Sequence, residues 1–293
     1  MAGMASASVI VPAHDEAALL GATLRALLSD VEAGALEVVV VANGCGDDTA
    51  ALARSVPGVR VLEIAEASKA AAVAVGNEVA RTFPRVHLDA DCVIAGPDVL
   101  RLVRAVTEPG VLAAGPARRL DTAGASWWVR GYYRVWERLP GVRAGLYGRG
   151  VVALSAEGQR RVDGLPRVQS DDLAISEAFA PEERRVVPEA VVAIRVPRTA
   201  RDLLRRRVRV ATGNHQADRL GIRRPGSSTS PRTLARIARR EPRLLPALTV
   251  FVTTALAARA LAQGAVRRGD YTTWLRDESS RAGDRAVERG DRR

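Results

Sequence analysis

Short apolar runs alternate with segments of helical spacing from residue 8 to residue 88, and this alternation restricts the fold more than any other feature of the sequence. Runs of β-branched and other apolar residues predict buried strands, and apolar residues that recur every three or four positions predict helices. Strands that alternate with helices across short links form a parallel sheet covered on both faces, so we expect the α/β class. The strands are expected at 8–12, 37–41, 59–64 and 86–88, and the helices at 17–28, 48–55 and 69–80.

The rest of the chain predicts further elements of both kinds, followed by a helical end. Strands are expected at 110–116, 146–155 and 186–196, and helices at 99–106, 126–138, 171–179 and 197–211. A stretch rich in Gly, Pro and Ser at 221–232 indicates a linker or loop. Residues 244–262 predict a long apolar helix, and 267–293 a charged tail.

The chain has a surplus of positive charge, with a formal net charge of +11 over 293 residues. Such a surplus favours anionic partners, namely nucleotide diphosphates, nucleic acid or an acidic lipid surface, and does not choose among them. The 26% share of charged residues argues against a protein with many membrane spans. The basic residues are arginines with one exception, Lys69.

Cysteine usage and the N-terminal residues predict a location in the cytoplasm. Cys45 and Cys92 are too few for a disulfide framework and lack the spacing of metal ligands, which favours a reducing compartment. Residues 1–8 do not have the charged and apolar layout of an export signal.

Polar turns follow the first two predicted strands. Residues 11–16 read Val-Pro-Ala-His-Asp-Glu, and residues 42–48 read Ala-Asn-Gly-Cys-Gly-Asp-Asp. Ligands of such sheets bind beyond the carboxyl ends of the strands, where glycine permits a close approach and carboxylates or amides hold ring nitrogens and ribose hydroxyls. Ordinary helix-capping turns are the alternative. Lys69 begins the third helix, where its charge would face phosphate, unless it is simply a solvent-exposed lysine.

The sharpest signal is Asp89-Ala90-Asp91, which directly follows the fourth strand. Two carboxylates this close repel each other unless a cation neutralises them. Oxygen ligands suit a hard divalent ion, so we expect Mn²⁺ or Mg²⁺ here, bound also by diphosphate oxygens and water. Such an ion acts as a Lewis acid for a departing nucleotide diphosphate.

The combined motifs resemble the family 2 glycosyltransferases of GT-A fold over residues 8–215. The resemblance rests on the segments 9–16, 41–47, 69–72 and 89–91 in this order and spacing. It implies a Rossmann-like, mostly parallel central sheet with helices on both faces, and a nucleotide-sugar donor such as a UDP- or GDP-sugar. Residues expected at the donor are Pro12, Ala13, Asp15, Glu16, Asn43, Lys69, Asp89, Ala90 and Arg209.

Two departures from the family pattern affect these assignments. An acidic pair is usual in the second turn, where this chain has Ala42-Asn43, so the identity of the base stays open. Residues 206–213 look like a degenerate Gln-x-x-Arg-Trp segment, with Arg209 in the arginine position and Val210 in place of tryptophan. Arg209 would pair with the diphosphate as a planar bidentate donor, and a solvated basic helix is the alternative.

The resemblance also implies a general base in the acceptor half. The segment 169–172, Gln-Ser-Asp-Asp, matches that element, so Asp172 is the expected base and Asp171 the second choice. A carboxylate within hydrogen-bond reach removes the proton of an attacking hydroxyl, and a single displacement inverts the anomeric centre. Helix capping is the alternative role of this pair. We expect Asp91 to bind the metal, with Asp89 and His215 as further candidate ligands.

These expectations divide the chain at three points. A GT-A catalytic domain is expected at 1–215, with a donor half at 1–116 and an acceptor half at 117–215. An Arg-rich linker or mobile loop should follow at 216–243, and the apolar helix with its charged tail at 244–293. Arginines flank this helix, so peripheral contact with the inner face of the membrane stays open beside simple packing on the catalytic domain.

Three other functions are alternatives to the glycosyltransferase. A nucleotidyltransferase that makes nucleotide-sugars should have a basic glycine-rich loop after the first strand, where this chain has an acidic turn. A nucleic-acid-binding protein is permitted by the arginine surplus but lacks recognition motifs, so nucleic acid is not an expected partner. A dinucleotide-dependent dehydrogenase is excluded, since no Gly-x-Gly-x-x-Gly follows the first strand. The hydroxyl acceptor is not identified.

Overall fold

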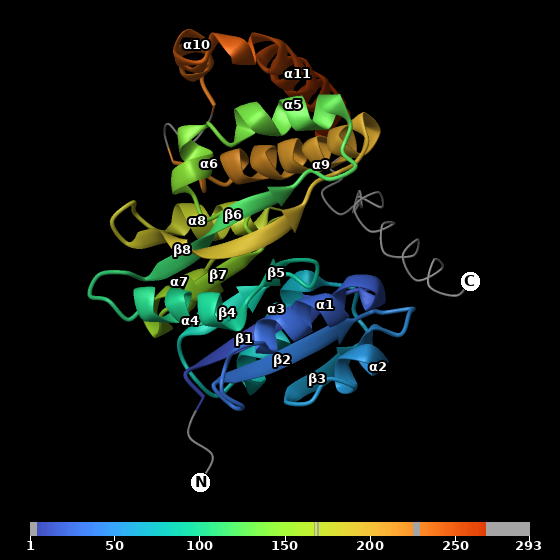
Figure 1. Cartoon of the computed structure of the whole chain (residues 1–293), viewed down its shortest axis with the longest axis vertical. Helices are drawn as coiled ribbons and strands as arrows, with labels where there is room; N and C mark the ends of the chain where they lie inside the picture. Colours follow the sequence, from blue (N-terminus) through green and yellow to red (C-terminus); the bar gives the residue numbers. More distant parts are fainter. Residues whose placement is uncertain (1–4, 167, 169, 225–228, 268–293) are drawn as a thin grey trace. The chain divides into compact units, whose positions relative to one another are not determined.

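The protein is described here by a computed structural model that covers residues 5–166, 168, 170–224 and 229–267. Within these residues the strands form one eight-stranded sheet with the order β3-β2-β1-β4-β7-β6-β8-β5 (Figure 1). The sequence elements expected from residue 8 to residue 88 are all present, because the apolar runs are buried in the sheet and the helical segments cover it.

Four parallel strands form the N-terminal part of the sheet: β1 (Ala7–Ala13), β2 (Leu36–Asn43), β3 (Val59–Ile64) and β4 (Arg85–Leu88). The central strand β1 pairs with β2 on one side and with β4 on the other, and Val9 lies opposite both Val38 and Val86. Every residue of β1 is buried, as expected for a strand that has neighbours on both edges and helices on both faces.

Helices cover both faces of this parallel part: α1 (Ala17–Leu28), α2 (Thr49–Arg54), α3 (Lys69–Val79) and α4 (Gly96–Ala105). Alternate residues of β2 point to opposite faces. Val38 and Val40 belong to the main core, together with residues of α1, α2 and α4. Val39 and Val41 pack against Ala72 of α3 on the other face. The expected α/β sheet with helices on both faces is confirmed.

The remaining strands extend the sheet with antiparallel pairs: β5 (Val93–Ile94), β6 (Ala113–Asp121), β7 (Val151–Leu154) and β8 (Arg184–Arg195). Leu154 of β7 lies opposite Arg85 of β4 and also opposite Ala113 of β6. Helix α7 (Ala156–Asp163) follows β7 directly. The strand expected at 146–155 is shorter, since Gly148 and Gly150 have positive φ angles and belong to the turn before it.

The described residues divide into two compact units. The first unit comprises residues 5–120, 148–165 and 179–194, and contains the sheet apart from the last residue of β6 and of β8. The second unit comprises the described residues of 121–147, 166–178 and 195–267, and is mainly helical. The division of the chain into donor, acceptor and linker segments stays a prediction.

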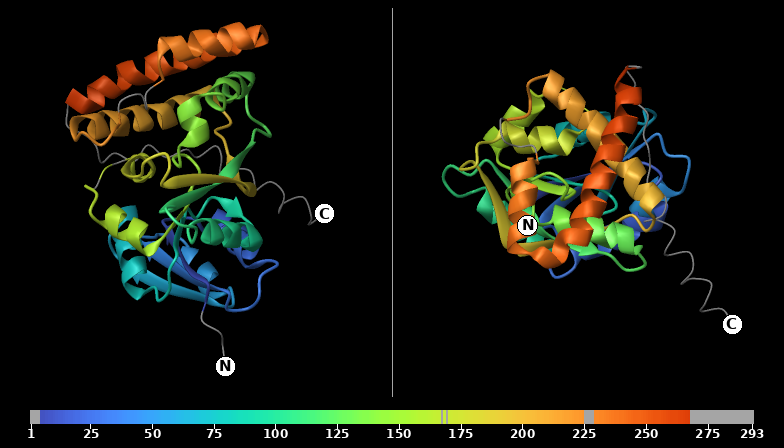
Figure 2. Two further views of the ribbon diagram at one scale, coloured as in Figure 1. Left: turned by 90° about the vertical axis from the view of Figure 1, so that its left-hand side faces the viewer. Right: turned by 90° about the horizontal axis from the view of Figure 1, so that it is seen from above.

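The second unit is built from helices: α5 (Trp127–Trp136), α6 (Pro140–Ala144), α8 (Asp171–Ala178), α9 (Ala200–Arg219), α10 (Pro231–Arg240), the 3₁₀ turn η1 (Pro242–Leu244) and α11 (Leu245–Arg267). Helix α11 packs against α5 and α9 (Figure 2). The Tyr132 and Phe251 rings stack 5.0 Å apart, and Trp128 Nε1 donates to Thr254 Oγ1 at 3.0 Å. The apolar helix expected at 244–262 is therefore present, with one side in the core of this unit.

The segment 216–243, for which we expect a linker or mobile loop, contains regular structure. It holds the last turn of α9 and the whole of α10. Ser230 caps α10 by accepting from the backbone N–H of Thr233, and Pro231 is its first residue. Of the residues between the two helices, 225–228 lie outside the described residues, as does the tail from 268.

Candidate active site

The polar turns that are predicted to bind ligands lie at the carboxyl ends of neighbouring strands. Strands β2, β1 and β4 are parallel neighbours, and Ala13 at the end of β1 lies opposite Ala42. The carboxyl ends of these three strands therefore lie next to one another. Pro12, one of the expected donor residues, lies within β1, opposite Val41, and is buried.

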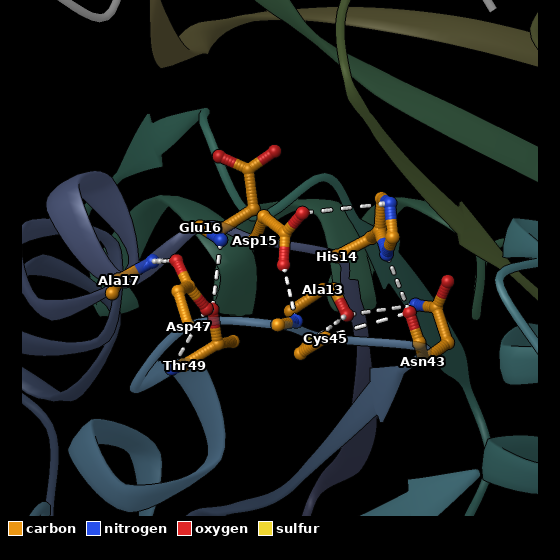
Figure 3. A network of polar contacts seen from close by, with 10 residues as sticks. Ala13, His14, Asp15, Glu16, Ala17, Asn43, Cys45, Asp47 and Thr49 are labelled. Carbon is orange, nitrogen blue, oxygen red and sulfur yellow. Dashed lines mark hydrogen bonds and ion pairs between the residues drawn. The ribbon is translucent and has the colours of Figure 1, made fainter. Parts of the chain in front are cut away.

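Hydrogen bonds join the first turn to the second (Figure 3). The Asn43 amide nitrogen donates to the Ala13 carbonyl at 2.8 Å and to the Val41 carbonyl at 3.3 Å. Both amide hydrogens of Asn43 are thereby used within the chain, so this side chain can contact a base only through its oxygen. Asn43 is 3% exposed, which fits a residue that holds two turns together.

Carboxylates and backbone N–H groups continue this network toward α1 and α2. Asp15, with a φ of 49°, accepts through Oδ1 from the Gly46 N–H at 2.7 Å. The backbone N–H of Glu16 donates to Thr49 Oγ1 at 2.8 Å, and that of Ala17 donates to Asp47 Oδ2 at 3.2 Å. The starts of α1 and α2 are therefore fixed to each other across the two turns.

The acidic loop after β4, residues 89–92, forms an ion pair with the one lysine of the chain. Lys69 Nζ, from the first residue of α3, lies 2.8 Å from Asp89 Oδ1, and both side chains are about one-third exposed. Asp91 is exposed. Ligand atoms of Asp89, Asp91 and Cys92 lie within 4.8 Å of one another, so this loop can hold a cation. The expected role of Lys69, which is to face phosphate, stays a prediction.

Backbone contacts fix the acidic loop from two sides. The Asp89 N–H donates to the Gly150 carbonyl at 2.8 Å, and Thr23 Oγ1 of α1 donates to the Ala90 carbonyl at 2.8 Å. Ala90 is 4% exposed, so its contribution is through the backbone.

Sequence reasoning did not identify Gly150 or Arg149 as parts of this region. Gly150 has a φ of 66°, and a Cβ atom there would lie 2.2 Å from Cys92 Sγ and 3.2 Å from Asp89 Oδ2. Arg149 is 2% exposed and donates to the Pro116 carbonyl at 2.5 Å. The glycine pair at 148 and 150 was a visible signal, but nothing in the sequence shows that it adjoins residue 89.

Asp171 and Asp172, the expected base candidates, are the first two residues of α8 in the second unit. Asp172 Oδ1 accepts from the Leu173 N–H at 2.7 Å, and the side chain is exposed. Gln169 of the same motif lies outside the described residues.

Arg209 and His215 lie on α9, in the same unit. Helix α9 passes close to the start of α8, because a Cβ atom on Gly213 would lie 2.1 Å from Ser170 Oγ. Arg209 precedes Gly213 by four residues, one turn of helix, and therefore lies on the same face of α9. The roles of Asp171, Asp172, Arg209 and His215 stay predictions.

A parallel sheet whose strand ends carry an acidic pair and two polar turns is an α/β protein with a candidate ligand site at those ends. The model of glycosyl transferase family 2 matches residues 8–154, and the chain belongs to this family. It is accordingly a glycosyltransferase of GT-A fold, as the resemblance implies. A search of curated protein sequences gives no match.

Solved glycosyltransferases share the fold of this chain. A mannosyltransferase from Pyrobaculum calidifontis, solved with GDP-Man and Mn²⁺, is 24% identical with a TM-score of 0.61, over 99% of this chain and 89% of that chain. Glucosyl-3-phosphoglycerate synthase from Mycobacterium tuberculosis, solved with phosphoglyceric acid, is 21% identical with a TM-score of 0.56, over 77% and 83% of the two chains. The same synthase, solved with Mg²⁺ and UDP, is 20% identical with a TM-score of 0.53, over 77% of this chain and 82% of that chain.

Proposed function

We propose that this glycosyltransferase takes its sugar from a nucleotide-diphosphate donor, a UDP- or GDP-sugar, and transfers it to a hydroxyl acceptor with inversion. The observation that carries the proposal is the acidic loop of Asp89 and Asp91, beside Lys69, at the edge of the sheet where the polar turns also lie. Structures of the same fold contain GDP-Man with Mn²⁺, or UDP with Mg²⁺.

The residues of the acidic loop fit a hard divalent cation. Asp91 and Asp89 would hold Mn²⁺ or Mg²⁺ through carboxylate oxygens, the ligands that these ions prefer. Gly150 leaves space against Asp89 and Cys92 that any side chain would fill. When bound, the ion supplies Lewis-acid stabilisation of the negative charge on the leaving nucleotide diphosphate. Lys69 adds a positive charge for the same phosphates.

The polar turns would hold the base and ribose. Asp15 and Glu16 offer carboxylate acceptors for ribose hydroxyls, and Asn43 offers its amide oxygen to a base. Ala13 contributes a backbone carbonyl that is fixed by Asn43.

In the second unit, Asp172 would accept the proton of the acceptor hydroxyl as the oxygen attacks C1 of the sugar. Asp171 is the second candidate for this step. Arg209 would pair with the diphosphate, and His215 would be a further metal ligand. These assignments rest on the family resemblance and on the position of Asp171 and Asp172 at the start of α8.

Two substitutions and one control test the proposal. Asp91→Asn should abolish turnover and metal-dependent nucleotide binding, whereas Asp172→Asn should abolish turnover but leave nucleotide binding intact. Asp30→Asn is the control, since Asp30 is exposed, lies outside the site, and has a positive φ that asparagine tolerates. Calorimetry with UDP, GDP and dTDP sugars, with and without Mn²⁺, identifies the donor. Full turnover in both variants would contradict the proposed roles.

We also propose that the enzyme is cytoplasmic and binds the inner membrane surface peripherally through α10 and α11. Residues 242–264 form a helical stretch apolar enough to cross a membrane by length and composition, but 39% of its most apolar window is buried in the protein. Leu245 and Leu256 are 54% and 58% exposed and are eleven residues apart, about three helical turns, so they share one face of α11. Arginines 232, 236, 239 and 240 are exposed on α10, where they suit anionic lipid.

Vesicle flotation tests this contact on the full chain, since removal of α11 would expose the core of the second unit. The protein should float with anionic vesicles and not with neutral phosphatidylcholine vesicles. The double substitution Leu245→Glu and Leu256→Glu should abolish flotation with the anionic vesicles. Leu220→Glu is the matched control, because Leu220 is 53% exposed but lies at the end of α9. Unchanged flotation of the double variant excludes this surface.

A further inference from the structure

A second group of metal-ligating side chains lies in the polar turns, apart from the acidic loop. His14 and Asp15 follow β1, Cys45 follows β2, and one ligand atom of each lies within 4.8 Å of the other two. All three side chains are half-buried. Figure 3 shows them in one network, with His14 and Asp15 on one turn and Cys45 on the other.

The orientation of His14 is the one that a metal-binding histidine needs. His14 Nδ1 lies 2.6 Å from the Asn43 carbonyl oxygen. A carbonyl oxygen only accepts, so Nδ1 carries the proton and donates it. Nε2 then faces Asp15, with Oδ2 at 3.8 Å. Metal-bound histidines commonly donate their other ring N–H to a backbone carbonyl in this way, which fixes the ring and its tautomer.

The other two ligands are also held in place. Asp15 Oδ1 accepts from the Gly46 N–H at 2.7 Å, which leaves Oδ2 on the His14 side. Cys45 Sγ lies 3.4 Å from the Ala13 carbonyl, to which the thiol donates. Gly44, with a φ of 59°, packs so closely on Ala67 that a Cβ atom would lie 2.8 Å from it. The turn that carries Cys45 therefore has little freedom to move away.

We infer that His14, Asp15 and Cys45 form a binding site for Zn²⁺ or a similar borderline-soft divalent ion. Thiolate, imidazole and carboxylate are the ligands of zinc, whereas the oxygen ligands of Asp89 and Asp91 favour Mn²⁺ or Mg²⁺. Tetrahedral zinc places its ligand atoms about 3.5 Å apart, so side-chain shifts of about 1 Å close the site. Asp15 and the Cys45 thiolate balance the two charges of the ion. The fourth position stays open to water.

This site has a regulatory consequence that rests on the proposed function. Asp15 and the turn around it are assigned to the nucleotide-sugar donor, so zinc and donor would compete. The ion would act as an inhibitor at the nucleotide end of the site, distinct from the ion that assists transfer.

Cobalt is a suitable probe because a Co²⁺–thiolate bond gives a near-ultraviolet charge-transfer band, and the readout needs no activity. The band should appear when Co²⁺ is added to the full chain and disappear when Zn²⁺ is added. Cys45→Ser should abolish the band, and His14→Gln should weaken Co²⁺ binding at least tenfold. Cys92→Ala, which removes the other thiol, should keep the band. Absence of the band in the native chain, or its persistence in Cys45→Ser, would falsify the site.

Calorimetry separates this inference from the proposed function. Zn²⁺ should weaken binding of the Mn²⁺–nucleotide at least tenfold in the native chain and not in Cys45→Ser. If nucleotide binding is the same with and without Zn²⁺, the competitive role is wrong. If no nucleotide binds although the cobalt band is present, the donor assignment fails and the zinc site stands.

Discussion

Position 150, next to the acidic loop, accepts only glycine. Its φ of 66° and the 2.2 Å that would separate a Cβ atom from Cys92 Sγ both require glycine. Gly150→Ala should lower the free energy of unfolding by about 1–3 kcal/mol, since alanine is strained there and displaces Cys92. Urea denaturation measures this.

Gly164→Ala is the matched control. Gly164 has a φ of −81°, and an added Cβ atom would have its nearest neighbour at 3.6 Å. Alanine there should leave stability unchanged or raise it by up to about 1 kcal/mol. Equal unfolding midpoints for the two variants would show that the tight contact at Gly150 is unimportant.

Replacement of Lys69 should have a small effect on the stability of the fold and a large effect on nucleotide-diphosphate binding. The Lys69–Asp89 pair is about one-third exposed, so Lys69→Met should change the free energy of unfolding by less than about 1 kcal/mol. The same substitution should weaken nucleotide-diphosphate binding by roughly tenfold or more, because a charged hydrogen bond to phosphate contributes about 1.5–3 kcal/mol. Calorimetry measures the affinity, and Lys69→Arg should retain most of it. Identical affinities of the methionine variant and the native enzyme would remove Lys69 from the donor site.

At the scale of elements, Glu37 of β2 connects β1 to the segment before β4. It accepts from Ser8 Oγ at 2.6 Å and from the Arg81 N–H at 2.8 Å. Burial acts to raise the pKa of Glu37, but these hydrogen bonds and the charges of Arg81 and Arg85 outweigh it, so the pKa is lowered. A lowered carboxyl pKa stabilises the fold above the ordinary glutamate pKa of about 4.3, and this contribution is lost as the pH falls through the lowered pKa.

Glu37→Gln should therefore lower the free energy of unfolding by about 1–3 kcal/mol at neutral pH. The difference from the native chain should shrink as the pH falls below about 4. Denaturation series at several pH values measure both effects. Glu63→Gln on β3 is the control. Glu63 is 56% exposed, so this substitution should lower the free energy of unfolding by less. A constant difference across the pH range would contradict the role of the ionised carboxylate.

The elements that could be predicted are those whose pattern is local. Strands β1 to β4 and their helices follow from apolar runs and spacing, and the parallel order of the strands brings Lys69 and Asp89 to one edge. Strand β5 has only two residues, Val93–Ile94, and its partner Ala193 is a hundred residues away, so no local pattern marks it. Gly150 beside Asp89 depends on the same kind of distant pairing. Helix α10 did have a local signal, Ser230-Pro231, which the surrounding Gly, Pro and Arg residues obscured.

At the scale of the whole molecule, the net charge of +11 will attract any polyanion at low salt. Non-specific binding to duplex DNA should fall steeply between 50 and 200 mM salt, by about a thousandfold or more if six or more phosphates are contacted. Donor binding depends on fewer charges and should fall much less. Fluorescence anisotropy with labelled DNA, in competition with nucleotide-sugar, measures both. DNA that still binds tightly at physiological salt would favour a nucleic-acid function.

The two units are interleaved along the chain, because each is assembled from three separate stretches of sequence. The stretch 121–147 leaves the first unit after β6 and returns to it just before β7, so for that unit it is a closed loop whose ends are held by neighbouring strands. Longer loops cost little extra closure entropy, which makes such insertions tolerable during evolution. Once such an insertion is present, recombination cannot easily exchange one unit without the other. No single recombination point between two genes of this family separates one unit from the other, so exchange of the sheet always carries part of the helical unit with it.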